Sequence, residues 1–111
     1  MARVERIAML QQLVSSKYSL NHIEDALIEE LGELIQAIIK NRRSHGCGCH
    51  TDKTPNATFY GIKEEIADVN ILLGQYVDKL EQEVYYNFDA REIGDIMERK
   101  LQRQLDRLRG E

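Results

Sequence analysis

The sequence predicts an all-α protein with a four-helix bundle-like fold in a single domain, residues 1–111. Leu, Ile, Glu, Gln, Arg and Ala dominate the composition, and these residues favour helices. The chain contains one proline and no tryptophan. Its apolar residues recur at amphipathic helical spacing in four segments. Four such helices in a chain of 111 residues would bury their apolar faces against one another, which predicts a bundle.

The first two helices are predicted from apolar periodicity. In residues 3–16 most apolar side chains fall on one side of a helix. A second amphipathic pattern runs from about residue 21 to residue 41. Asn21 followed by Glu24 has the spacing of a capping box, in which each side chain satisfies a free backbone N–H at the helix start. We therefore expect the second helix to begin near Asn21.

The second half of the chain holds a loop and two further helices. Residues 42–56 are polar, contain glycine and are broken by Pro55, so they are predicted to form an inserted loop. The third helix is expected over residues 57–83, and it is long for so small a domain. A capping box of Asp89 and Glu92 opens the fourth helix, which continues almost to the end of the chain. The exposed apolar surface of the long helix predicts a homodimer or a higher oligomer.

Composition and charge exclude several classes of protein. Apolar residues make up 42% and charged residues 31% of the chain, as expected for a globular protein. The net charge of −4 argues against a nucleic-acid binder, which needs a basic surface. No apolar run is long enough to span a bilayer, and the N-terminus lacks a signal-peptide core. We therefore expect a cytoplasmic protein with no membrane partner.

Acidic residues border the apolar stripes of the second and third helices. Glu30 and Glu33 lie one turn apart beside the stripe of the second helix, and Glu65 and Asp68 repeat this arrangement on the third. If the two helices pack stripe to stripe, the four carboxylates can converge. Two acids one turn apart are also common on solvated helix faces, but two such pairs on successive helices indicate a site.

Converging carboxylates repel one another unless a positive charge pairs with them. A hard divalent cation does this well. Because every available ligand atom is an oxygen, the set favours Mg²⁺, with Mn²⁺ as the second candidate, over zinc. Mg²⁺ keeps open positions that bind substrate phosphates, so the sequence predicts a metal site for a phosphorylated substrate.

These residues also carry a resemblance to a known family. "EELGE" at 29–33 followed by "EIAD" at 65–68 resembles the EExxE…ExxD motif of the MazG-like all-α nucleotide pyrophosphohydrolases. The similarity continues through "EEIADVNILLGQ" and "KLQRQLDRL" and is closest to the short, single-domain, phage and bacterial members. By motif position, the resemblance implies that Glu30, Glu33, Glu65 and Asp68 are the metal ligands and catalytic residues.

The resemblance implies Mg²⁺-dependent hydrolysis of a (deoxy)nucleoside triphosphate to the monophosphate and pyrophosphate. It also implies dimers or dimers of dimers. The chain departs from the family in the longer 42–56 loop and in Asn70, where close relatives often carry an acid. Two other functions stay open: a phosphoribosyl-ATP pyrophosphohydrolase-like enzyme, which shares the acidic motif, and a non-catalytic helical interaction module.

The last predicted helix is strongly basic. Lys100 and Arg103 share one edge of it, next to an apolar stripe. Cations near a helix C-terminus can simply complement the helix dipole. They can also neutralise phosphate oxygens, with Arg able to bind two of them at once. Because family members use basic residues here, Lys100 and Arg103 are the predicted substrate-binding residues.

The sequence leaves two further questions open: zinc binding and base preference. The segment "HGCGCH" offers His45, Cys47, Cys49 and His50 as zinc ligands. Structural zinc sites usually bring together two separated ligand pairs, so a loop without zinc is preferred. The base preference is also open: Tyr18, Asn70 and Tyr76 could form a base pocket, but each also suits a structural role. Glu29, further round its helix, is interpreted as a surface acid or as a residue that positions water.

Overall fold

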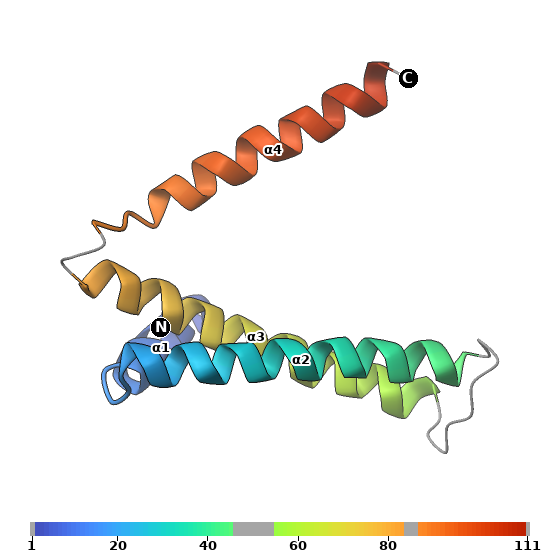
Figure 1. The fold of residues 1–111 in the computed structure, drawn as a ribbon, viewed down its shortest axis with the longest axis horizontal. Helices are drawn as coiled ribbons and strands as arrows, with labels where there is room; N and C mark the ends of the chain where they lie inside the picture. The colour runs from blue at the N-terminus through green and yellow to red at the C-terminus, as the bar shows by residue number, and fades with distance from the viewer. Residues whose placement is uncertain (1, 46–54, 84–86, 111) are drawn as a thin grey trace. The chain divides into compact units, whose positions relative to one another are not determined.

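All four predicted helices are present. The computed structural model describes residues 2–45, 55–83 and 87–110, and no strand occurs in these ranges. The helices are α1 (Arg3–Ser15), α2 (Leu20–Ser44), α3 (Pro55–Gln82) and α4 (Arg91–Gly110), as Figure 1 shows. The predicted all-α class is therefore confirmed. The chain divides into two compact units, Met1–Lys79 and Leu80–Glu111, and each is described by itself. The single domain stays a prediction.

Within the first unit, α1 contacts α3 through a polar side chain at a glycine. The amide Nε2 of Gln11 donates a hydrogen bond to the Ile71 carbonyl oxygen at 3.1 Å. A Cβ atom at Gly74 would lie 2.6 Å from that Nε2 atom. Gly74 therefore leaves the space that Gln11 needs to reach the backbone of α3.

The helix α2 begins near the predicted place, but its predicted N-cap is wrong by two residues. Ser19, rather than Asn21, is the N-cap: its backbone is extended and its hydroxyl accepts a hydrogen bond from the His22 N–H at 3.1 Å. Serine is as good an N-cap as asparagine, so the helix begins at the earlier residue. The carboxylate of Glu24, expected in the capping box, instead accepts a hydrogen bond from Tyr76 on α3.

The pairing of α2 and α3 forms the frame of the first unit. The two helices run side by side in opposite directions (Figure 1). Near one end, the Tyr76 hydroxyl donates to a Glu24 carboxylate oxygen at 2.9 Å. Near the other end, the buried Thr58 hydroxyl lies 2.9 Å from the Ser44 hydroxyl and donates to the Asn41 side-chain oxygen at 3.1 Å. These contacts fix which turn of α2 lies opposite which turn of α3.

The predicted loop at 42–56 is too long at both ends. α2 continues through Ser44, whose hydroxyl donates to the Asn41 carbonyl oxygen at 2.7 Å besides contacting α3. α3 begins at Pro55. Proline suits the first position of a helix because the N–H that it lacks would have no helical partner there. Residues 46–54 of the predicted loop lie outside the described residues.

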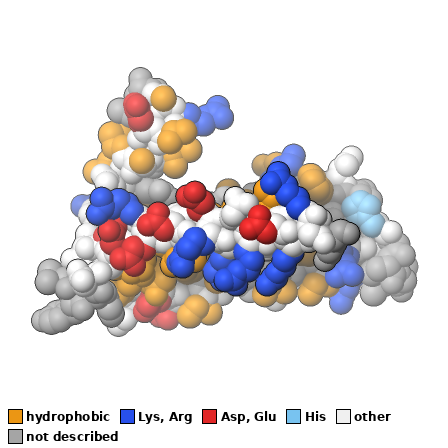
Figure 2. Space-filling view, turned by 90° about the horizontal axis from the view of Figure 1, so that it is seen from above, with side chains coloured by type: hydrophobic (Ala, Val, Ile, Leu, Met, Phe, Trp, Pro, Cys, Tyr) orange, Lys and Arg blue, Asp and Glu red, His pale blue; other side chains and the backbone are white. Residues whose placement is uncertain are grey.

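The core of the described residues is small. Ile23 and Leu27, one turn apart on α2, are its buried apolar residues. Many other large apolar side chains reach the surface between acidic and basic ones, as Figure 2 shows. None of the described helices combines the length and apolar composition needed to cross a membrane.

In the second unit, a charged cap opens α4. Asn87 has a φ of 46°, which asparagine tolerates better than most residues. The Asp89 carboxylate then accepts hydrogen bonds from the Arg91 backbone N–H at 3.0 Å and from its guanidinium at 3.1 and 3.0 Å. These bonds to Arg91 lower the pKa of Asp89 below its usual value. Asp89 therefore accepts a backbone N–H at the start of α4, but this N–H belongs to Arg91. Glu92 lies in the first turn, and the reciprocal capping box with Asp89 stays a prediction.

Candidate metal centre

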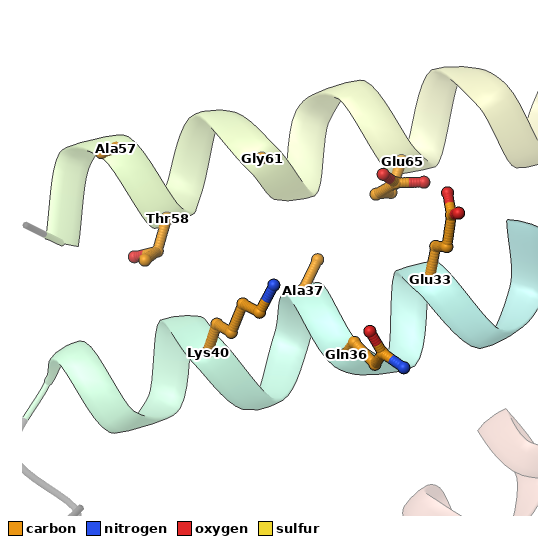
Figure 3. Close-up of a pocket in the computed structure, with 8 residues that line it drawn as sticks. All are labelled: Glu33, Gln36, Ala37, Lys40, Ala57, Thr58, Gly61 and Glu65. Carbon is orange, nitrogen blue, oxygen red and sulfur yellow. The ribbon is translucent and has the colours of Figure 1, made fainter. Parts of the chain in front are cut away.

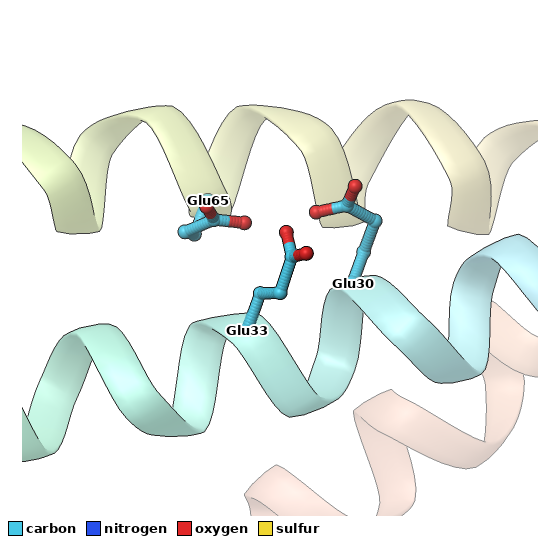
Figure 4. Close-up of side chains that lie close together, drawn as sticks. All are labelled: Glu30, Glu33 and Glu65. Carbon is cyan, nitrogen blue, oxygen red and sulfur yellow. The ribbon is translucent and has the colours of Figure 1, made fainter.

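Three of the four predicted ligands converge in the first unit. Glu30 and Glu33 lie one turn apart on α2, and Glu65 faces them from α3 (Figure 4). One carboxylate oxygen from each residue lies within 4.8 Å of the others. Glu30 and Glu65 are half-buried and Glu33 is exposed. The antiparallel pairing of α2 and α3 thus produces the acidic trio, defined as Glu30, Glu33 and Glu65.

The fourth predicted ligand, Asp68, lies beside the trio. It is half-buried, one turn beyond Glu65 on α3. Its negative charge is one cause of the raised pKa of Glu30, so the two carboxyl groups interact. Among the described residues, the three carboxylates of the trio are close enough together to hold one metal ion, and Asp68 is not among them. The role of Asp68 as a ligand stays a prediction.

The trio is electrostatically unfavourable without a cation. The pKa of Glu30 is raised from 4.5 to about 7, first by burial, then by side-chain hydrogen bonds with Glu65 and Glu33, and then by repulsion from Glu33 and Asp68. When the carboxyl groups are ionised, one oxygen each of Glu30 and Glu65 is buried without a hydrogen-bond partner. Among the described residues, no lysine or arginine forms an ion pair with the trio.

This donor set fits a hard divalent cation. Buried polar atoms normally have partners, so two unpartnered oxygens in one cluster require an explanation. A cation bound by these oxygens would supply that partner and would remove the repulsion among the carboxylates. Carboxylate oxygens are the ligands that Mg²⁺ and Mn²⁺ prefer. The trio could therefore hold such an ion, with open positions left for phosphate oxygens.

A cavity of about 380 Å³ adjoins the trio along the groove between α2 and α3. Figure 3 shows the residues that line it: Glu33, Gln36, Ala37 and Lys40 from α2, and Ala57, Thr58, Gly61 and Glu65 from α3. Its volume lies in the range of small-molecule sites. Sequence reasoning missed Lys40 as a member of this site. The available signal was its spacing, because Lys40 lies two helical turns after Glu33 on the same face.

The predicted phosphate-binding residues lie in the second unit. Lys100 and Arg103, with Ile96 and Arg99, line a hollow of about 190 Å³ on α4. Lys100 and Arg103 thus line one hollow, in agreement with the shared edge that the sequence predicts, and Arg99 joins them there. Their role in binding substrate stays a prediction.

The three residues considered for a base pocket have other neighbours. The Tyr18 ring stacks on His22, with 4.5 Å between ring centroids and 10° between planes. Asn70 is exposed. Tyr76 lines a pocket of about 290 Å³ with five residues of α2, namely Glu24, Asp25, Leu27, Ile28 and Leu31. Tyr76 is thus the one member of the three that lines this pocket.

Most of the residues proposed as zinc ligands lie outside the described residues. His45 follows α2, and its Nδ1 atom lies 2.8 Å from the Asn41 carbonyl oxygen. This contact accounts for one ring nitrogen of His45 without a metal. Cys47, Cys49 and His50 lie outside the described residues, so zinc binding by the segment stays open.

Comparison with protein-family models, with curated proteins and with solved structures found no match for this chain. The resemblance to the MazG-like family thus depends on the motif and stays a prediction. The case for a metal centre depends on the geometry and charge of the trio.

The raised pKa of Glu30 predicts that the metal-free protein loses stability as pH rises. Between about 4.5 and about 7, folded Glu30 keeps a proton that the unfolded chain releases. The free energy of unfolding should therefore fall across this range, and Glu30→Gln should remove that part of the fall. Urea denaturation of both proteins in a metal chelator, at about pH 5 and about pH 8, measures the difference.

Glu64→Gln is the matched control, because Glu64 is an exposed acid on α3 next to the trio. It should keep the pH dependence of the wild type. If Glu30→Gln and Glu64→Gln show the same pH dependence, Glu30 is not held protonated by its neighbours.

Proposed function

We propose that this chain is a Mg²⁺-dependent nucleoside triphosphate pyrophosphohydrolase of the MazG-like type. The observation that carries the proposal is the acidic trio: three carboxylate oxygens within 4.8 Å of one another, at motif positions, with unpartnered buried oxygens on Glu30 and Glu65. The products would be a (deoxy)nucleoside monophosphate and pyrophosphate. Since nucleotides of the cell are the proposed substrates, the proposed location is the cytoplasm.

Each site residue has a proposed role. Glu30, Glu33 and Glu65 would hold Mg²⁺, or Mn²⁺ in its place, and Asp68 is proposed as a further ligand from the adjacent turn. The ion would supply charge neutralisation for the phosphate oxygens and would polarise the phosphorus that water attacks. Attack of water on the α-phosphorus would form a new P–O bond and break the bond from that phosphorus to the bridging oxygen. Pyrophosphate would depart with that oxygen, and the proton of the water would pass to solvent.

The protein's own contribution is to position the reacting groups. The hydrogen bonds at Tyr76 and Thr58 hold α2 and α3 in register, and this register keeps the carboxylates of the trio together. Preorganised ligands avoid reorganisation during the reaction. Lys100 and Arg103 are proposed to bind substrate phosphates, supported by the basic hollow that they line on α4.

We also propose that the protein works as a homodimer or homotetramer. A row of apolar side chains on α2 is exposed: Ile28, Leu31, Ile35, Ile38 and Ile39. Ile28 is 69% and Ile35 is 59% exposed. Soluble monomers rarely expose contiguous apolar patches of this kind, so a second copy of the chain is the proposed cover.

Removal of any one ligand charge should abolish most of the activity. Glu30→Gln, Glu33→Gln, Glu65→Gln and Asp68→Asn each keep the side-chain shape but weaken the ion site. We expect pyrophosphate release to fall by about 100-fold or more, since loss of an outer-shell partner alone typically costs roughly 10–100-fold. The measurement is a pyrophosphate-release assay with Mg²⁺ across the common ribo- and deoxynucleoside triphosphates.

The control for this assay is again Glu64→Gln, which should keep wild-type activity. Glu24 is unsuitable as a control because it accepts the hydrogen bond from Tyr76. Circular dichroism of each variant verifies that the helices are intact. Full activity in all four ligand variants would remove the acidic cluster from the mechanism, and a helical interaction module would then explain the fold better.

The apolar row on α2 predicts a specific effect on assembly. Ile35→Glu places a charge in the middle of the row and should shift the protein toward monomers, because burying an unpaired charge is costly. Gln12→Glu adds the same charge at an exposed position on α1 and should leave assembly unchanged. Light scattering coupled to size-exclusion chromatography gives the masses. A monomeric wild type would contradict the proposed assembly.

A further inference from the structure

The cavity beside the trio has two chemically different ends. Glu33 and Lys40 are seven residues apart on α2, and Thr58 and Glu65 are seven apart on α3. Because the helices are antiparallel, the two glutamates share one end of the cavity, and Lys40 and Thr58 share the other (Figure 3). Seven residues of α-helix rise by about 10 Å. The cavity is therefore acidic at one end and basic at the other, about 10 Å away along the groove.

Among the described residues that line the cavity, Lys40 is the one cation. Its side chain extends into the space between α2 and α3, with Nζ directed toward the cavity (Figure 3). No acid of the described residues forms an ion pair with it. Its charge is therefore available to a ligand inside the cavity.

Small residues line the rest of the cavity. Ala37 on α2 and Gly61 on α3 lie between the two ends, and Ala57 lies next to Thr58 at the basic end. A Cβ atom at Gly61 would meet nothing within 4 Å, so the space beside this glycine is open. Gln36 adds a neutral amide to the lining, which can donate hydrogen bonds to an anionic oxygen. With a lysine and an amide in its described lining and no large apolar side chain, the cavity suits an extended anion better than a bulky apolar group.

We propose that this cavity binds the polyphosphate chain of the substrate, and that Lys40 holds the end that leaves as pyrophosphate. This inference rests on the proposed function, in which the trio binds a metal ion. The metal end would hold the phosphates at which hydrolysis takes place. Lys40, a compact positive charge on a flexible stem, would neutralise the oxygens of the terminal phosphate. Lys40 is thus a specificity residue that favours triphosphates over shorter nucleotides.

The test is steady-state kinetics of Lys40→Met with a nucleoside triphosphate and Mg²⁺. Methionine keeps much of the apolar stem but loses the charge. The KM for the triphosphate and the inhibition constant of pyrophosphate should both rise by about tenfold or more, since charge-assisted hydrogen bonds to phosphate are lost. Inhibition by the nucleoside monophosphate should not change. A purely structural role of Lys40 would not separate the two products in this way.

Two variants complete the series. Lys40→Arg keeps a positive charge and should retain most of the pyrophosphate affinity. Lys63→Met is the matched control, because Lys63 lies on α3 over the Phe59 ring, outside the cavity lining. It should behave as the wild type. Unchanged KM and unchanged pyrophosphate inhibition in Lys40→Met, with an active wild type, would overturn the role of Lys40 and leave the proposed function intact.

Calorimetric titration with magnesium pyrophosphate separates the remaining outcomes. If the wild type hydrolyses no triphosphate but binds pyrophosphate through Lys40, the cavity is a polyphosphate site and the proposed activity is wrong. If the wild type neither hydrolyses triphosphates nor binds pyrophosphate, both the proposed function and the role of Lys40 are overturned.

Discussion

The register between α2 and α3 is the constraint on which the candidate site depends. Tyr76 joins Glu24 near one end of the pair, and Thr58 joins Asn41 and Ser44 near the other. Each contact is a side-chain hydrogen bond that is lost if either helix slides by a turn. With both ends fixed, the middle of the pair places the trio on facing turns. The same register places Lys40 at the far end of the cavity.

Repulsion among the carboxyl groups of the trio destabilises this pairing of α2 and α3. Three carboxyl groups within 4.8 Å raise the free energy of the folded chain, and protonation of Glu30 relieves part of the repulsion. A chain selected for stability alone would avoid two buried oxygens without partners. Such strain is common where a site is organised for a ligand. A divalent cation would stabilise the folded state, because it would bind the folded chain and not the unfolded chain.

Much of this arrangement could be predicted from the sequence. Apolar periodicity located four helices, and the placement of acids at the borders of two apolar stripes predicted the convergence of Glu30, Glu33 and Glu65. Both features repeat along the chain with a helical period. The N-cap of α2 was wrong because Ser19 and Asn21 are equally good caps, and periodicity does not distinguish them. Its end was wrong because the contact between Ser44 and Thr58 joins residues of different helices.

The cavity could not be predicted for the same reason. Lys40 belongs to it because of what α3 places opposite, namely small side chains and a glycine one turn from Glu65. The spacing of Lys40 from Glu33 places both residues on one face of α2. The sequence of α2 alone does not distinguish Lys40 from an ordinary solvated lysine. Periodic features within each helix can therefore be predicted from the sequence, and the trio follows once the two apolar stripes pack together. The lining of the cavity also needs the register between the helices.

The most direct test of the metal centre is a titration of the chelator-treated protein with Mn²⁺, in which electron paramagnetic resonance measures the free ion. Wild-type protein and Glu64→Gln should remove Mn²⁺ from solution, and added Mg²⁺ should release it by competition. Glu30→Gln and Glu65→Gln should bind it far more weakly. Equal Mn²⁺ binding in all four proteins, or none in the wild type, would contradict a metal centre built from Glu30, Glu33 and Glu65.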